Sequence, residues 1–157
     1  MEFEEIYTSF SPKIFRLCLG YVSDKDLAKD LTQETFIQVW KNLEKFRNES
    51  AIGTWIFRIA SNICLRQIER SSKMEKTELP FQMEDKKEDH LNEQVELLYK
   101  CINTLEETDR LIISLVLEDL PQKEIAAITG ISEGNIRVKI HRIKQTLTQR
   151  FNDHAKL

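Results

Sequence analysis

Residues 120–147 read LPQKEIAAITGISEGNIRVKIHRIKQTL, and they predict two helices joined by a tight turn. Pro121 suits the first turn of a helix, because its missing N–H would have no partner there. Gly130 stands where a turn needs a positive φ, which glycine adopts without strain. Ser132 is a favourable N-cap for the helix that follows. A helix, a glycine-containing turn and a second helix make a helix-turn-helix motif.

The second helix of this motif has one apolar face and one cationic face. Its apolar residues recur at i, i+4, i+7 and i+11 as Ile136, Ile140, Ile143 and Leu147. From Gly134 to Arg150 there are five Lys or Arg and no Asp or Glu, so this helix lacks the acidic partners of a charge-balanced surface helix. A cationic helix face of this kind suits the major groove of DNA. The residues expected to contact DNA are Arg137, Val138, Lys139, His141 and Arg142.

The composition indicates a helical chain. Among 157 residues, four Gly and three Pro are too few breakers for an all-β fold, and the net charge of −3 conceals the basic helix near the C-terminus. Cys18, Cys64 and Cys101 lack disulfide or metal-ligand spacing, so we expect buried thiols in a reducing cytosol. The acidic start MEFEE and the lack of a long apolar run predict neither signal peptide nor membrane span, and hence a cytoplasmic protein.

Apolar residues spaced by three and four predict further helices in the N-terminal half. Pro12 interrupts this spacing between residues 3 and 21, which predicts a break between two short helices. Ser23 or Asp24 is a suitable cap for a helix that runs to about Lys45. The inner face expected for that helix consists of Leu27, Leu31, Phe36, Val39, Trp40 and Leu43.

A loop, a third helix and a polar segment follow. The loop is expected at 46–50, and Ile52, Ile56, Ile59 and Ile63 then predict a helix that runs towards Glu69. Residues 71–90 are dense in Lys, Glu and Asp, contain Pro80, and have no sustained apolar period. We therefore expect a flexible linker there.

Helical spacing resumes after the polar segment. One helix is predicted by Val95, Leu98, Cys101, Ile102 and Leu105, and another from Asp109 to Glu118. The expected fold is therefore all-α, with two small helical domains. The first is expected at 1–72 and the second at 91–152, joined by a flexible linker at 73–90.

Several stretches together carry a resemblance to a known family. Residues 125–137, IAAITGISEGNIR, with the lead-in LEETDRL at 105–111, resemble region 4 of extracytoplasmic-function (ECF) sigma factors, although Asn135 stands where that family usually has Thr. Residues 30–40, DLTQETFIQVW, resemble sigma region 2, and residues 54–62, TWIFRIASN, resemble its promoter-melting helix. The motifs follow the family's order and cover nearly the whole chain.

The resemblance implies a sigma factor that directs core RNA polymerase to specific promoters and promotes DNA opening, without a cofactor, a metal or enzymatic activity. The implied partners are core RNA polymerase, promoter DNA and an anti-sigma factor. Region 4 would bind the −35 element through the cationic helix. Residues implied to contact the −10 element are Arg47, Asn48, Trp55, Arg58 and Asn62. Residues implied to contact the polymerase clamp are Asp30, Gln33, Glu34, Phe36 and Trp40.

Each of these roles has a structural alternative. The polar residues of the clamp group fall at i, i+3 and i+4, a stripe that an ordinary surface helix also shows. Phe36 and Trp40 could equally be core aromatics. Trp55 could stack on melted DNA or pack in the core beside Ile59.

Other classes of protein remain alternatives for the whole chain. A helix-turn-helix regulator that acts without polymerase core binding would share the C-terminal motif, and copurification with core polymerase separates the two. An enzyme is disfavoured, because His90, His141 and His154 lack the spacing of a metal site.

Overall fold

The computed structural model describes residues 2–48, 51–71 and 90–155, and these form helices without any strand. The expected all-α class is therefore confirmed for this part of the chain. The N-terminal helices are α1 (Phe3–Val22), α2 (Lys25–Asn42), the 3₁₀ helix η1 (Leu43–Lys45) and α3 (Ile52–Ser71). The C-terminal helices are α4 (His90–Asn103), α5 (Glu107–Leu117), α6 (Gln122–Thr129) and α7 (Glu133–Ala155). The expected linker lies outside the described residues, except for His90, which begins α4.

Helix α1 is continuous through Pro12, so the predicted break is wrong. A proline inside a helix removes one backbone hydrogen bond and costs about 3 kcal/mol. Six positions of α1 are buried: Ile6, Ile14, Leu17, Cys18, Gly20 and Tyr21. They lie on both sides of Pro12, and only one unbroken helix brings both groups to the same core. Packing thus outweighs the local preference of proline.

The two residues expected as helix caps, Ser23 and Asp24, cap different helices at the junction between α1 and α2. Ser23 adopts a left-handed backbone (φ 59°) and its N–H donates to the Leu19 carbonyl, so it ends α1. Asp24 begins α2, because its carboxylate accepts hydrogen bonds from the N–H groups of Asp26 at 2.9 Å and Leu27 at 3.2 Å. Two residues therefore reverse the chain and pack α2 against α1.

The core of the N-terminal module lies between α1, α2 and α3. Of the inner face expected for α2, Leu31, Phe36 and Val39 are buried, and Leu27 and Leu43 are partly buried. Trp40 is 64% exposed, so its assignment to the inner face is wrong. Of the four isoleucines expected on the inner face of α3, Ile56 and Ile63 are buried, and Ile52 and Ile59 are partly buried.

The C-terminal module has the predicted helix-turn-helix. Gly130 ends α6 with φ 77°, and its N–H donates to the Ala126 carbonyl at 2.9 Å. The Ser132 hydroxyl accepts from the Asn135 N–H at 3.3 Å and caps α7. Pro121 is the N-cap of α6, directly before its first turn. The four apolar residues of α7 predicted to face inwards are all buried: Ile136, Ile140, Ile143 and Leu147.

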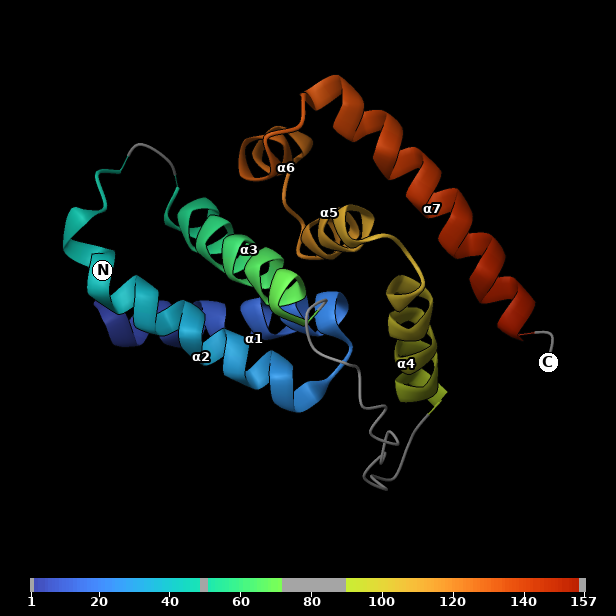
Figure 1. Ribbon diagram of the computed structural model, residues 1–157, viewed down its shortest axis with the longest axis horizontal. Coiled ribbons are helices and arrows are strands. Elements are labelled where there is room, and N and C mark those ends of the chain that lie inside the picture. The colour runs from blue at the N-terminus through green and yellow to red at the C-terminus, as the bar shows by residue number, and fades with distance from the viewer. Residues whose placement is uncertain (1, 49–50, 72–89, 156–157) are drawn as a thin grey trace.

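The two modules pack directly against each other. Helix α1 contacts α4 and α5, and α3 contacts α6. In Figure 1, α5 lies between the bundle of α1 to α3 and the long helix α7. The buried side chains of both modules form one continuous cluster. No pattern in the sequence predicts this contact.

Candidate functional site

The cationic face of α7 points to solvent. Arg137, Val138, His141 and Arg142 are exposed, and Lys139 is partly buried. None of the cations on this face forms an ion pair with a carboxylate in the part of the chain that the structure describes. The opposite face of the same helix is held by the buried residues that pack on α4, α5 and α6. Helix α7 therefore presents unpaired positive charge on a rigid support.

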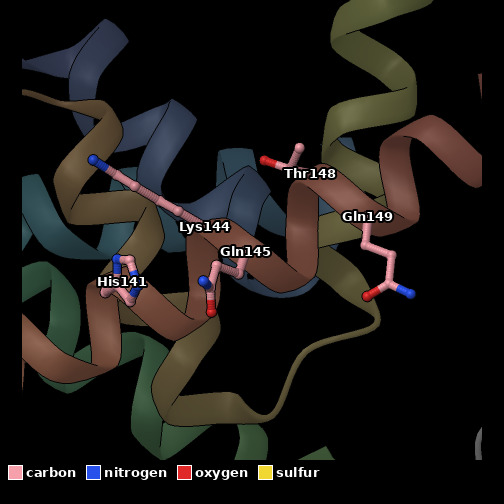
Figure 2. Close-up of a pocket in the computed structure, with 5 residues that line it drawn as sticks. All are labelled: His141, Lys144, Gln145, Thr148 and Gln149. Atoms are coloured by element: carbon pink, nitrogen blue, oxygen red, sulfur yellow. The ribbon is translucent and has the colours of Figure 1, made fainter.

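This face continues as an open hollow of about 570 Å³ towards the C-terminal end of α7. All five residues that line it come from α7 (Figure 2): His141, Lys144, Gln145, Thr148 and Gln149. Because a single helix lines it, the hollow does not enclose a small molecule. Its lining side chains are polar and Lys144 adds a positive charge, so this part of α7 suits an anionic ligand such as a nucleic-acid backbone.

The second group of residues predicted to contact DNA lies in the loop before α3 and along the first half of that helix. Arg47 and Asn48 are exposed in the loop before it, where Asn48 adopts a left-handed backbone (φ 57°) that asparagine tolerates better than most residues. Arg58 is partly buried and Asn62 is exposed, one helical turn further along. The structure thus places these four side chains at least partly within reach of solvent.

Trp55 is partly buried and packs against Phe46, with ring centroids 4.9 Å apart and planes tilted by 34°. This contact joins the loop to α3 and supports the core-packing alternative for one side of the indole. The contact places Phe46, just after η1, against the first turn of α3.

The third group of residues lies along α2. Asp30 and Gln33 are exposed, and Glu34 is partly buried. Phe36 is only 3% exposed, whereas Trp40 is largely exposed. The two aromatic residues therefore differ: Phe36 belongs to the core, and Trp40 belongs to the surface.

An apolar groove of about 390 Å³ connects these residues to α1. It is lined by Phe3, Tyr7, Gln33, Phe36, Ile37 and Trp40. The Phe3 ring lies 5.1 Å from Trp40, and the Tyr7 ring lies 5.0 Å from Phe36, both edge to face. Tyr7, Ile37 and Trp40 are exposed along this groove, and a contiguous exposed apolar surface of this kind marks a site for another macromolecule.

Three residues of the groove were not predicted as site residues from the sequence: Phe3, Tyr7 and Ile37. Tyr7 is 45% exposed and Ile37 is 52% exposed. Phe3 and Tyr7 stand four residues apart on one face of α1, but apolar spacing predicts core and interface residues alike. The sequence did contain one indication of the groove: α1 and α2 have more apolar residues than a single inner face needs.

The three cysteines are buried free thiols, as expected. Cys18 and Cys64 lie in contact, with their sulfur atoms 3.8 Å apart. The hydrogen bond to Cys18, together with burial, raises the pKa of the Cys64 thiol well above its ordinary value. Across the described residues, no three His, Cys, Asp or Glu side chains gather as metal ligands would. No described helix has the length and apolarity needed to span a membrane.

Comparison with known proteins gives consistent relatives for both modules. Residues 6–74 match the family described as Sigma-70 region 2, and residues 95–147 match Sigma-70, region 4. The chain is 30% identical to the ECF RNA polymerase sigma factor SigM of Bacillus subtilis, over 97% of this chain and 96% of SigM. It is 25% identical to SigW of the same species, over 96% of this chain and 89% of SigW. Its structure resembles the sigma factor RpoE of Bartonella quintana, solved in complex with the anti-sigma factor NepR, with a TM-score of 0.82, 20% identity and 96% of each chain covered.

A helix-turn-helix with an unpaired cationic face, joined to a helical module with an exposed aromatic groove, defines a DNA-binding transcription protein that also binds a second macromolecule. Both family matches fall on these modules in the order that sigma factors have. The chain belongs to the ECF sigma factors of the sigma-70 family. It therefore directs core RNA polymerase to promoters, and a regulator that acts without polymerase is not favoured.

Proposed function

We propose that three separate surfaces of this chain carry its role in initiation. The outer face of α7 binds the −35 element as duplex. The groove between α1 and α2 binds the polymerase clamp, together with the polar stripe beside it. The loop before α3 and the exposed part of α3 bind −10 bases once they are unpaired. The observation that carries the proposal is the exposed aromatic groove on one module and the unpaired cationic helix on the other.

The −35 assignment follows from the position of the cations on α7. Arg137 lies in the first turns of the helix, and Arg142 lies about one and a half turns further along. In a helix-turn-helix the N-terminal part of the second helix enters the major groove. Arginine there pairs with guanine edges or with phosphates, and Lys139 adds charge towards the backbone.

The −10 assignment follows from the energetics of strand separation. Taking a base out of the duplex costs a few kcal/mol of stacking and pairing. A surface that binds the unpaired base, and cannot bind it in duplex, shifts the equilibrium towards open DNA without ATP. Arg58 and Asn62 lie one turn apart on α3 and supply a cation and an amide for the displaced strand. Arg47 and Asn48 supply polar groups from the loop, and the exposed part of Trp55 offers a stacking surface.

The proposal extends to control and location. The solved relative RpoE is bound to an anti-sigma factor, and we infer that this chain has such a partner, which would cover the polymerase and DNA surfaces. Because core polymerase is its partner, the chain acts in the cytoplasm. Its role is differential binding and needs no catalytic group, so we infer that it is not an enzyme.

The test is run-off transcription with purified core polymerase on genomic fragments, including the promoter of its own gene. Arg142→Ala should weaken binding to the −35 duplex about tenfold, because one arginine contact to DNA is worth roughly 1–3 kcal/mol. Asn152→Ala, an exposed and uncharged position near the C-terminal end of the same helix and outside the hollow, is the matched control. Failure of the wild-type chain to bind core polymerase or to initiate transcripts would refute the proposal.

A further inference from the structure

The solvent-facing side of α7 has an apolar residue at its centre. Val138 is 47% exposed, although the other exposed residues around it on the helix are polar, charged or glycine. Its neighbours on the helix surface stand three and four positions away, and they are Gly134, Asn135, His141 and Arg142. Within α7, which the structure describes from end to end, none of these neighbours covers the valine with an apolar side chain.

The position of Val138 follows from the helical period. The buried residues of α7 stand at 136, 140, 143 and 147, and the exposed residues two positions earlier have the same spacing: Gly134, Val138, His141 and Gln145. Two positions turn an α-helix by about 200°, so these four residues, which we call the outward stripe, point away from the core. His141 and Gln145 of this stripe line the open hollow on α7 (Figure 2). Val138 thus lies in the middle of the surface that α7 presents to a partner.

Gly134 leaves the Val138 side chain uncovered. Side chains on an α-helix lean towards its N-terminus, over the residues three and four positions earlier. Val138 therefore leans over the turn that contains Gly134, which has no side chain to cover the valine methyl groups. The glycine and the exposed valine together form a shallow apolar contact point within a polar helix face.

Neither the backbone nor the packing of the free protein requires a glycine at position 134. Its φ is not positive, unlike that of Gly130. A Cβ added to Gly134 would meet no atom within 4 Å. Glycine is also less favourable than alanine within a helix. Gly134 is therefore explained by a partner that approaches the helix backbone closely.

The chemistry of a thymine edge fits this contact point. The inference rests on the proposed function, in which the outer face of α7 enters the major groove of the −35 element. Base pairs present hydrogen-bond donors and acceptors in that groove, and thymine alone adds an apolar group, its C5-methyl. A valine side chain has no hydrogen-bonding group, so the methyl group is the part of a base edge that it can recognise.

We propose that Val138 reads a thymine of the −35 element through the C5-methyl group of that base, at a contact that Gly134 leaves open. The contact gives α7 a preference for thymine at one base pair. Arg137 and Arg142 beside it can also bind phosphates, which carry no sequence information. Val138 is then a specificity-determining residue, and Gly134 is a positioning residue that acts through it.

The test is a gel-shift titration of the full-length chain, assembled with core polymerase, on a promoter fragment that run-off transcription identifies. Each thymine of the −35 duplex is replaced in turn by deoxyuridine, which lacks only the C5-methyl group. One replacement should weaken binding by wild type about fourfold, the effect of one buried methyl group. Val138→Ala should lose this preference. Arg142→Ala should bind both duplexes more weakly and keep the preference.

Gly134→Ala tests the close approach separately from the stability of the fold. The added methyl group meets open space in the free protein, so the thermal midpoint should stay equal or rise. In the complex the same group lies between α7 and the base edge, so binding should weaken by at least about fivefold, as overpacking of a close contact does. Asn152→Ala, exposed and outside the outward stripe, is the control for both measurements. Wild-type affinity or a lower thermal midpoint in Gly134→Ala would overturn the role of Gly134.

The outcomes separate this inference from the proposed function. If no thymine replacement weakens binding, or if Val138→Ala keeps the full preference, Val138 reads no thymine and the inference is refuted while −35 binding stands. If exchange of the whole −35 duplex for an unrelated sequence leaves wild-type binding unchanged, α7 does not read this element. The proposed function then fails together with the inference.

Discussion

Replacing Trp40 by alanine tests the polymerase groove most directly. A tryptophan side chain has roughly 200 Å² of surface, and Trp40 leaves 64% of its own exposed in the free protein, so about 130 Å² is available to a partner. At about 25 cal/mol per Å², burial of this area contributes up to about 3 kcal/mol of binding free energy. We therefore expect Trp40→Ala to weaken binding to core polymerase by about a hundredfold.

The same substitution should leave the fold almost unchanged. Trp40 contacts Phe3 but contributes little buried surface, so we expect its loss to lower the free energy of unfolding by less than about 1 kcal/mol. Phe36→Ala should do the opposite and destabilise by about 3–5 kcal/mol, because Phe36 is 3% exposed.

The assay is a titration of labelled chain with core polymerase, read by fluorescence anisotropy, with thermal unfolding measured on the same samples. Lys41→Ala, at the next position of α2 and also exposed, is the control. If Trp40→Ala binds core within threefold of wild type while remaining folded, the groove is not the polymerase surface. An equal loss for Lys41→Ala would show that the effect is not specific to the groove.

Three further predictions concern other parts of the chain. Asn62→Ala should impair promoter opening, read by permanganate reactivity of unpaired thymines, more than closed-complex formation, read by gel shift; equal loss at both steps would contradict the role of Asn62. Ile136→Ala should lower the free energy of unfolding by about 2–5 kcal/mol, since Ile136 is fully buried, and a change in thermal midpoint below 1 °C would show that the α7 core is misassigned. Cys64 should resist iodoacetamide at pH 8 until denaturant is added, because the contact with Cys18 and burial raise the pKa of Cys64 and its thiolate is scarce at that pH; Cys18 should resist because it is fully buried and the reagent cannot reach it. Rapid labelling of Cys18 or Cys64 in the native protein would refute this prediction.

Local chemistry explains why the helix-turn-helix could be predicted closely. Gly130 needs the left-handed backbone that it adopts at φ 77°, and the Ser132 hydroxyl caps α7 as expected. These features depend on a few neighbouring residues, and the buried face of α7 follows from a period of 3.6. The position of the motif's cations could be predicted for the same reason.

Pro12 shows where local chemistry fails. Its preference for a helix break is real, but it competes with burial of apolar residues on both sides of it in α1. The balance is decided by α2 and α3, which are distant in the sequence. The prediction for Trp40 is wrong for a different reason. Helical spacing placed Trp40 on the inner face of α2, but the core covers fewer positions of α2 than this spacing suggests, and Trp40 is largely exposed. Apolar periodicity gives the direction of a side chain but does not say whether the chain itself or a partner covers it.

The contact between the modules could not be predicted for a related reason. Arg16 and Glu118 carry no local signal, since each is an ordinary charged residue on a helix or at its end. Their pairing depends on Gly20 and Ser114, which let two helices that are distant in the sequence approach each other. Only the assembled core brings such residues together.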